Sequence, residues 1–352
     1  MIRIGIIGCN YGRQVHLPAF RLDSRCSVVA LAGSDAARTA GLARASDIPL
    51  AFGDWRALVE NPGVDAVTIG TPPGLQPSIA VRALNLGKAV FAEKPMAADV
   101  AGAEAMLKAA SSSGRANVID FNFSAIPVWQ RAKELLDQGV IGRLRHVAVS
   151  WHVENQTTRL RLKNWKSSGD LGGGALGNFV SHCLHYVEWM CGPIQRLSAH
   201  LSGPPDAADL ETNAMIGIAL RSGAAGSIMM SCASYNGSGH RTEFYGEDGA
   251  LSLINPTRDY MRGFELRLAR RPEDFSLIEV DDLLDGRFPE DGRIAPVARL
   301  ARRFLNAIEG GPPASPRFAE GLRVQVLLDA ARISNRSGSW VDVSKDISGL
   351  YK

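Results

Sequence analysis

The sequence has no apolar run approaching the roughly 20 residues that a membrane-spanning helix needs. Met1 leads directly into the apolar segment 2–7, so the charged start, apolar stretch and cleavage site of a signal peptide are missing as well. Both absences predict a cytoplasmic protein that does not engage a membrane.

Cysteine and net charge are also scarce. The five cysteines are odd in number and have no CxxC spacing, so we predict reduced thiols, no disulfide framework and no metal site. A net charge of +3 on 352 residues gives no reason to expect a nucleic-acid partner. Hydrophobic residues at 45% and charged residues at 21% are typical of a globular chain with an ample core, and the length favours two domains.

In the first 121 residues, short apolar runs alternate with helical patterns. The predicted strands are 2–7, 28–32, 65–69, 89–92 and 116–119, and the predicted helices are 36–45, 76–86 and a segment from the cap residue Asp99 to about 112. Strands and helices that alternate at this spacing form a parallel, doubly wound sheet. We therefore predict an α/β chain with a Rossmann domain at residues 1–121.

The loop after the first strand is a candidate cofactor site. It contains Gly8, Asn10, Tyr11, Gly12 and Arg13. Glycines let the backbone approach a pyrophosphate, and a following helix offers its N-terminal N–H groups. The loop is one residue short of the GxGxxG pattern, and a plain tight turn would explain it equally well. Its place between a first strand and a helix favours dinucleotide binding.

The end of the second predicted strand bears on the choice between NAD and NADP. A carboxylate there would bind the ribose 2′-hydroxyl and repel a 2′-phosphate. The chain has Gly33 and Ser34 at this point, and Asp35 comes two places late and is expected to cap the next helix. Arg38 or Arg13 could pair with a phosphate, although an exposed helix arginine is the alternative. We predict NADP as the cofactor, with NAD as the other possibility.

The segment 89–95, AVFAEKP, ends a predicted buried strand in charged residues. Ligands of open α/β sheets bind beyond the carboxyl ends of the strands, so Lys94 is expected to face a site. A lysine in a partly dry cleft can exchange protons near neutral pH. The alternative is a loop lysine that reaches into water.

The second part of the chain shows more strand patterns than helix patterns. The predicted strands are 144–152, 195–201, 214–220, 226–232, 241–245, 250–254 and 263–269, and two helices are predicted at 296–309 and 318–334. Because no helical pattern separates most of these strands, we expect them to pair antiparallel. Residues 122–352 are thus predicted to form an α+β domain with an open, mostly antiparallel sheet.

The segment from Trp165 to His185 is rich in glycine and histidine. The glycines 172–174 permit a close approach of the backbone to a ligand or a strand. Asn178 and His182 are four residues apart and His185 is three further on, so one helix face would carry all three. A structural histidine in so apolar a helix is the alternative.

Together these features resemble the Gfo/Idh/MocA family of oxidoreductases. The matching stretches are 4–12, 16–20, 71–73, 87–95 and 172–182. The resemblance implies that Lys94 lies at the nicotinamide, often with a cis peptide before Pro95. It also implies that the cofactor cleft is lined by Thr71, Pro72, Gln76 and Glu93. Family members often cover the free face of the second sheet with another subunit, so a homodimer or homotetramer is expected.

The family pattern GGGALxDxGxHxxD is only partly kept. Asn178 stands in place of the first Asp and His185 in place of the last, whereas His182 is retained. The resemblance implies that Lys94 and His182 are the catalytic pair. The candidate substrate contacts are Asn122, Trp165, Asn178 and His185.

The sequence therefore predicts an NAD(P)-dependent oxidoreductase that acts on a small molecule. Hydride would pass between the nicotinamide and a secondary alcohol or ketone carbon of a sugar, cyclitol or related polyol. A dinucleotide-binding sensor of the same fold, without turnover, is the alternative, because the glycine loop is short and Asn178 replaces a carboxylate.

Overall fold

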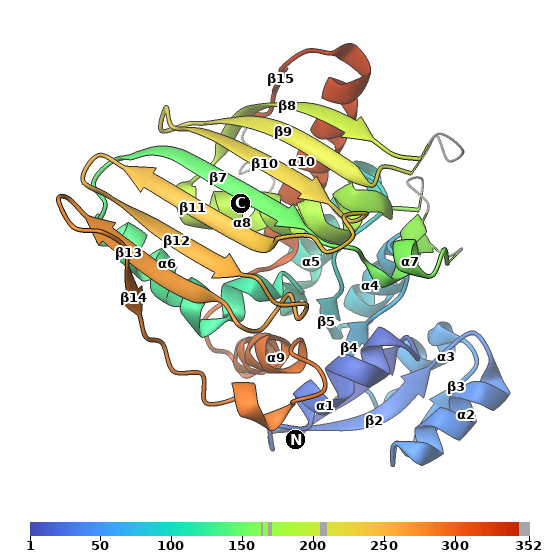
Figure 1. Ribbon diagram of the computed structural model, residues 1–352. Coiled ribbons are helices and arrows are strands. Elements are labelled where there is room, and N and C mark those ends of the chain that lie inside the picture. The colour runs from blue at the N-terminus through green and yellow to red at the C-terminus, as the bar shows by residue number, and fades with distance from the viewer. Residues whose placement is uncertain (163–164, 168–170, 205–209, 345–352) are drawn as a thin grey trace. The chain divides into compact units, whose positions relative to one another are not determined.

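The computed structural model describes residues 1–162, 165–167, 171–204 and 210–344 (Figure 1). The chain forms two compact units. Among the described residues, the first contains Met1–Asn122 and Arg287–Gln325, and the second contains Phe123–Gly286 and residues 326–344. The predicted boundary between two domains at residue 121 stays a prediction. The structure nevertheless groups 287–325 with the first unit rather than with the second.

The first unit contains a parallel sheet of six strands in the order β3-β2-β1-β4-β5-β6. The strands are β1 (Ile2–Ile7), β2 (Cys26–Ala32), β3 (Leu50–Phe52), β4 (Ala66–Ile69), β5 (Ala89–Ala92) and β6 (Asn117–Ile119). The order reverses between β1 and β4, and such a switch point opens a crevice at the carboxyl ends of the strands. The predicted Rossmann fold is confirmed.

Helices connect these strands. They are η1 (Gly12–His16), α1 (Leu17–Phe20), α2 (Ala36–Ala45), α3 (Trp55–Glu60), α4 (Gln76–Asn85) and α5 (Val100–Ser113). Aspartates 35, 54 and 99 accept backbone N–H groups at the starts of α2, α3 and α5, which stabilises each helix end. The predicted cap roles of Asp35 and Asp99 are thus confirmed, whereas the three-residue strand β3 and the short helix α3 escaped prediction.

Helix α9 (Ile294–Ile308) explains why 287–325 joins the first unit. Its Phe304 ring lies 6.3 Å from the ring of Phe20 and 5.9 Å from that of Phe91, all in edge-to-face geometry. Aromatic contacts of this kind add to the burial of a large apolar area. The apolar face of α9 is therefore used against α1 and β5.

The second unit contains a sheet of nine strands in the order β14-β13-β12-β11-β7-β10-β9-β8-β15. The strands are β7 (Leu144–His152), β8 (Ile194–Ser202), β9 (Asn213–Leu220), β10 (Ala225–Ser231), β11 (Gly239–Gly246), β12 (Gly249–Asn255), β13 (Glu265–Arg270), β14 (Ser276–Ile278) and β15 (Val341–Asp342). The prediction of a mostly antiparallel sheet is confirmed, and among the described strand pairs of this sheet β7 and β10 are the exception, because they pair parallel. The chain after β7 crosses over through helices instead of forming a hairpin. Strands β8, β9 and β10 then pair antiparallel in succession, and β10 lies parallel to β7.

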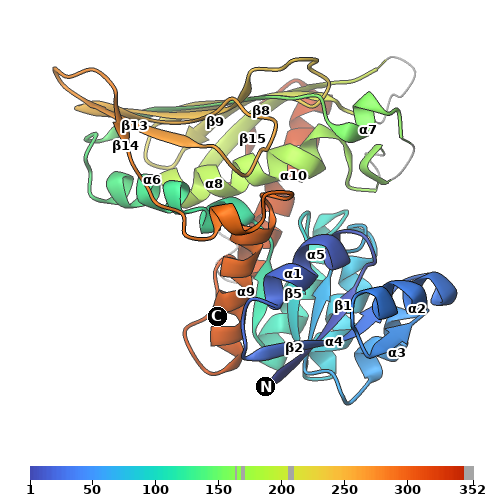
Figure 2. The same cartoon turned by 60° about the horizontal axis from the view of Figure 1, so that its bottom comes forward.

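One face of this sheet carries helices (Figure 2). The unit contains α6 (Pro127–Asp137), α7 (Gln156–Arg159), η3 (Trp165–Ser167), η4 (Leu176–Val180), α8 (Ser181–Cys191) and the end of α10 (Phe318–Ser337), while η2 (Asn122–Ala125) and η5 (Asp285–Arg287) lie at the junctions with the first unit. In the described part of the chain no helix covers the other face, where Met215 and Met229 are exposed. None of the described helices has the length and apolarity that a membrane span requires.

Candidate functional site

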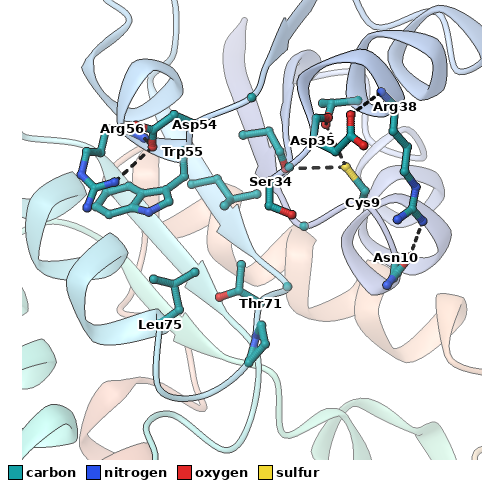
Figure 3. Close-up of a pocket in the computed structure, with 18 residues that line it drawn as sticks. Cys9, Asn10, Ser34, Asp35, Arg38, Asp54, Trp55, Arg56, Thr71 and Leu75 are labelled. Carbon is teal, nitrogen blue, oxygen red and sulfur yellow. Dashed lines mark hydrogen bonds and ion pairs between the residues drawn. The ribbon is translucent and has the colours of Figure 1, made fainter. Parts of the chain in front are cut away.

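A cavity of about 530 Å³ lies at the carboxyl ends of the first sheet's strands (Figure 3). Its wall comes from the loops after β1, β2, β3 and β4. Among the lining residues are Gly8, Cys9, Asn10, Gly33, Ser34, Asp35, Arg38, Gly53, Asp54, Trp55, Arg56, Gly70, Thr71, Pro72 and Leu75. Of the predicted cofactor contacts, the structure thus brings six together here, namely Gly8, Asn10, Ser34, Arg38, Thr71 and Pro72.

Glycines let the loop after β1 lie close to β4. Gly8 has φ +122°, and a Cβ on it would lie 2.4 Å from the carbonyl oxygen of Gly70. A Cβ on Gly12 would lie 2.8 Å from Cγ2 of Ile6. The loop is short because Tyr11 is already helical and leads into the π-type turn η1. It therefore keeps the tight turn and the close helix–strand packing of a dinucleotide loop with one residue fewer.

Tyr11, Gly12 and Arg13 do not line this cavity. The Tyr11 ring instead contacts the His16 ring edge-on at 5.3 Å, and the guanidinium of Arg293 lies 5.1 Å from its centroid. Arg13 is half-buried, and its Nε has no hydrogen-bond partner among the described residues. The roles predicted for these three residues stay predictions.

Arg38 and Asn10 meet on one wall, where Arg38 Nη2 donates to Asn10 Oδ1 at 3.3 Å. Asp35 accepts the backbone N–H of Arg38 at 2.9 Å, so it serves as the helix cap. Gly33 does not leave free space as its small size suggests. A Cβ there would lie 2.5 Å from Cys9 Sγ, so the position is already packed.

Figure 3 shows a second polar wall on the other side of the cavity, formed by Asp54, Trp55 and Arg56. Asp54 accepts the backbone N–H of Arg56 at 2.9 Å, and the Arg56 guanidinium lies 4.6 Å from the Trp55 ring centroid. Sequence reasoning missed this wall because β3 is too short to register as a strand. The available signal was the Gly53-Asp54 step, a turn residue followed by a helix cap.

Thr71 and Gln76 have different surroundings. Thr71 Oγ1 is buried and has no hydrogen-bond partner within the described ranges, and Thr71 lines the cavity. Gln76 lies outside the lining. Its Nε2 donates to the carbonyl oxygens of Glu93 at 2.8 Å and Pro95 at 2.7 Å, so it fixes the segment after β5. The Lys94–Pro95 peptide is cis, as expected, and Lys94 is half-buried.

Three buried ionisable side chains, including that of Glu93 in this segment, form a cluster. His16 Nε2 and Glu93 Oε1 are 2.9 Å apart. One side-chain nitrogen or oxygen atom from each of His16, Glu93 and Asp120 lies within 4.8 Å of the other two. Burial lowers the pKa of His16 to about 4, so its ring is neutral at pH 7. Burial, reinforced by the charge of Glu93, raises the pKa of Asp120 well above its ordinary value. His16 and Asp120 were not among the predicted site residues.

In the second unit, Asn178, His182 and His185 lie on one helical segment. Asn178 is in the π-type turn η4, and His182 and His185 follow in α8. A π turn changes the angular spacing, so the four-residue interval between Asn178 and His182 does not have ideal α-helical phase. Asn178 Nδ2 donates to the carbonyl oxygens of Gly174 at 2.8 Å and Lys166 at 3.2 Å.

Both histidines are buried. The His182 ring lies edge-on to Phe123, with 5.0 Å between centroids, and is only 4% exposed. Burial lowers the pKa of His185 to about 3, so it is neutral at physiological pH. A third buried histidine, His240, was not predicted; it stacks on Trp151 at 4.2 Å. These contacts place His182 and His240 in an aromatic layer between α8 and the sheet.

The glycine run before this helix approaches another part of the same chain. Gly174 has φ +71°, and a Cβ on it would lie 2.4 Å from Glu211 Oε1. Glu211 Oε1 also accepts the backbone N–H of Leu176 at 3.2 Å. Of the two uses predicted for these glycines, the structure therefore shows a close contact with the segment before β9.

The other predicted substrate contacts lie apart from these. Asn122 is buried, and its Oδ1 has no hydrogen-bond partner in the part of the chain described. Trp165 is half-buried in η3, and Lys166 Nζ lies 5.7 Å from its ring centroid. Neither observation tests a role in substrate binding.

The features of the cavity fit a dinucleotide. Glycine backbone lies next to a helix start, Arg38 and Arg56 supply positive charge, and Thr71 offers an uncommitted buried hydroxyl. These are the groups that bind phosphates and ribose in Rossmann folds. The fold and this site define a dinucleotide-binding α/β protein.

Comparison with known proteins gives the family. Residues 2–121 match the model of the Gfo/Idh/MocA oxidoreductase family, described as an NAD-binding Rossmann fold, and residues 129–252 match the model of its C-terminal domain. The chain belongs to this family, as the sequence analysis predicted.

Relatives match along the whole chain. A protein of Synechocystis sp. that is named only as an oxidoreductase is 32% identical over 97% of this chain and 96% of its own length. Levoglucosan dehydrogenase of Pseudarthrobacter phenanthrenivorans is 25% identical over 97% of this chain and 98% of its own. The crystal structure of an NAD-binding oxidoreductase from Klebsiella pneumoniae has a TM-score of 0.87 at 28% identity, and the match covers 98% of this chain and all of that one.

Proposed function

We propose that the protein is an NAD(P)-dependent dehydrogenase or reductase that acts on a secondary alcohol or ketone of a sugar, cyclitol or related polyol. The observation that carries the proposal is the glycine-lined cavity at the carboxyl ends of the first sheet, together with Lys94, which comes directly after Glu93 at the end of β5. Family membership and the name of the levoglucosan dehydrogenase relative support the substrate class.

The cavity residues would hold the cofactor. The bound nicotinamide would supply or accept the hydride. Backbone around Gly8 would approach the pyrophosphate, and the Thr71 hydroxyl would take a hydrogen bond with the ligand. We place the ribose that carries the 2′-phosphate beside Ser34 and Arg38, and we retain Pro72, Gln76 and Glu93 as residues that shape the cleft.

The proton chemistry is assigned to two residues. Lys94 would exchange the proton of the substrate hydroxyl, or polarise the carbonyl, and His182 would act as its acid–base partner. Asn122, Trp165, Asn178 and His185 are proposed to orient the substrate. Asn178 suits such a role because an amide both donates and accepts hydrogen bonds but cannot take up a proton.

The proposal is tested by following nicotinamide absorbance in a single turnover with a panel of polyols, cyclitols and the corresponding ketoses. We expect at least one substrate to be turned over, with Lys94 needed for the proton step. Cofactor binding without oxidation or reduction across a broad panel would contradict it.

The second candidate is a sensor that binds a dinucleotide without turnover. One observation favours it: the Asn178 amide already donates to two backbone carbonyl oxygens, which is a structural use of the position where the family carries Asp. A thermal shift with NAD(H) or NADP(H), followed by the substrate panel, separates the two candidates. Stabilisation by cofactor with no turnover supports the sensor.

We also propose that a second copy of the chain covers the face of the nine-stranded sheet on which the described residues place no helix. Met215 and Met229 face each other there across β9 and β10, and they are 50% and 39% exposed. Light scattering on the purified protein tests this. A dimer or tetramer that Met229→Arg splits into monomers is expected, and a monomeric native protein would contradict it.

A further inference from the structure

The buried cluster behind Lys94 is built by neighbouring elements of the first sheet. Glu93 directly follows β5 and Asp120 directly follows β6, and these two strands pair in parallel up to Ala92 and Ile119. His16 comes from η1. Asp120 is 1% exposed and His16 is fully buried, so water does not solvate the cluster freely.

The hydrogen bonds fix the state of His16. An ionised Glu93 can only accept, so in that state the 2.9 Å contact requires a proton on Nε2 of His16. The neutral ring then leaves Nδ1 as an acceptor, and Nδ1 has no partner among the described residues. Glu93 is therefore the acceptor of a histidine N–H.

Asp120 presents the opposite problem. Neither of its carboxyl oxygens has a donor in the described chain, and the carboxyl of Glu93 lies within 4.8 Å of it. Two ionised carboxylates cannot form a hydrogen bond, because neither has a proton to donate. Side by side in a dry site they also repel each other strongly. One proton on the pair solves both problems.

We propose that Asp120 and Glu93 hold one proton between them, with the Asp120 hydroxyl as donor to the Glu93 carboxylate, and that this pair is a positioning element behind Lys94. Glu93 then carries one negative charge, which receives hydrogen bonds from Asp120 and His16. The first half of the proposal concerns the folded protein alone. The second half rests on the proposed catalytic role of Lys94.

The charges around Asp120 show how the number of protons on the Asp120–Glu93 pair affects Lys94. The groups that act on it are Glu93 and Lys94, which are neighbours in the segment after β5, and His16 from η1. The positive charge of Lys94 favours ionised Asp120, whereas burial and the charge of Glu93 oppose ionisation and prevail. A second negative charge on the pair would favour the ammonium form of Lys94 further, and the shared proton removes that charge.

Infrared spectroscopy tests the shared proton without any variant. At pH 7 the native protein should show the carbonyl band of a protonated carboxylic acid, and the band should shift when aspartate, but not glutamate, carries ¹³C at the carboxyl carbon. Asp120→Asn should remove it, while Asp65→Asn, at an exposed aspartate paired with Arg3, should not. Absence of the band, or a band that follows labelled glutamate only, would overturn the assignment.

The pH dependence of stability gives an independent measure. A group whose pKa is raised on folding contributes stability that is present below its unfolded pKa, about 3.9 for Asp, and is lost as pH rises towards its folded value. The melting temperature of Asp120→Asn relative to the native chain should therefore rise with pH above about 4. A difference in melting temperature between the two proteins that stays constant from pH 4 to 8 would overturn the proposal. Elemental analysis that finds one tightly bound divalent metal per chain would also overturn it.

The positioning role is tested by the pH–rate profile. Glu93→Gln removes the remaining negative charge, so the limb that reports Lys94 should move to lower pH by about one unit or more. Asp120→Asn replaces a neutral acid with a neutral amide and should move that limb far less. If the infrared band is present but neither variant moves the Lys94 limb of the pH–rate profile, the positioning role is overturned. No turnover on any substrate, with the band present, would contradict the proposed enzyme function while supporting the shared proton.

Discussion

The two glycine-rich segments of the chain have opposite uses. At Gly8 a missing side chain lets two loops meet at the edge of an open cavity. At Gly174 the missing side chain makes room for Glu211, which fills the space with another part of the same chain. Both glycines have positive φ. A glycine run thus shows that something approaches the backbone closely, but the three-dimensional structure decides whether it is a ligand or the protein itself.

This difference assigns separate tasks to the two segments. The first unit keeps an open space with uncommitted polar atoms, such as Thr71 Oγ1. In the second unit the glycine turn, Glu211 and Asn178 are joined by hydrogen bonds that fix the start of η4. Variants in the first segment should therefore change ligand binding and turnover, and those in the second should first change stability.

The largest effect is expected for Lys94→Ala. Loss of a general acid–base group typically slows the chemical step by about 10²–10⁴-fold. Turnover should fall by that factor while cofactor affinity and melting temperature change little. The matched control is Lys108→Ala, at an exposed lysine of α5, which should be silent. Full turnover in Lys94→Ala on a true substrate would exclude the role that we propose.

Gly174→Ala should have the next largest effect, on stability. The left-handed conformation costs an alanine about 1–2 kcal/mol, and the contact with Glu211 adds an overpacking cost of about 1–3 kcal/mol. Gly139→Ala is the control, because Gly139 also has positive φ, at +69°, but a Cβ there would meet nothing within 4 Å. Thermal or urea unfolding should show a clearly larger loss for Gly174→Ala.

A double variant isolates the contact. Glu211→Ala should relieve part of the loss in Gly174→Ala, so the two changes should be less than additive. Equal losses for Gly174→Ala and Gly139→Ala would mean that Glu211 does not occupy the space, and the contrast between the two glycine segments would fail.

Sequence patterns predicted the elements whose signal is local. The apolar runs at 2–7, 89–92 and 144–152 became strands with those same bounds, and the cap at Asp35 followed from its place before a helix. What escaped prediction depends on contacts between distant residues. The parallel pairing of β7 with β10 follows from a crossover, and the grouping of His16, Glu93 and Asp120 comes from three separate segments.

The cavity shows the same limit. Its wall at Ser34 and Arg38 was predicted because a known pattern points to the end of the second strand. The wall at Trp55 and Arg56 was not, because a three-residue strand gives almost no periodic signal. Gly33 is small, but only the structure shows that Cys9 and Thr39 already fill the space beside it.

Arg38→Ala tests whether the open cavity prefers NADP(H) to NAD(H). We propose that Arg38 pairs with the 2′-phosphate, so its removal should weaken NADP(H) by about 1.5–3 kcal/mol, the range of a charge-assisted hydrogen bond, and leave NAD(H) nearly unchanged. Calorimetry with both cofactors measures this. The control is Arg44→Ala, at the exposed end of the same helix and outside the cavity. An equal loss for both cofactors would show that the choice between them is made elsewhere.

The smallest effect, and the one that best separates structure from chemistry, is expected for Asn178→Asp. The amide donates to the carbonyl oxygens of Gly174 and Lys166, and a carboxylate would face them without a proton. We expect a loss of about 1–3 kcal/mol at pH 7, from two hydrogen bonds at about 0.5–1.5 kcal/mol each. Because those carbonyl groups disfavour the charged form, the pKa of the new Asp should be raised on folding. The loss should therefore disappear as pH falls below about 3.9, where the acid is protonated and can donate again.

If position 178 also tunes His182, the new carboxylate should favour the protonated imidazole and move the pH–rate profile to higher pH. A change in KM alone would instead indicate that the residue orients substrate. Melting curves and profiles that match those of the native protein at every pH would show that neither the turn nor the proton chemistry depends on Asn178.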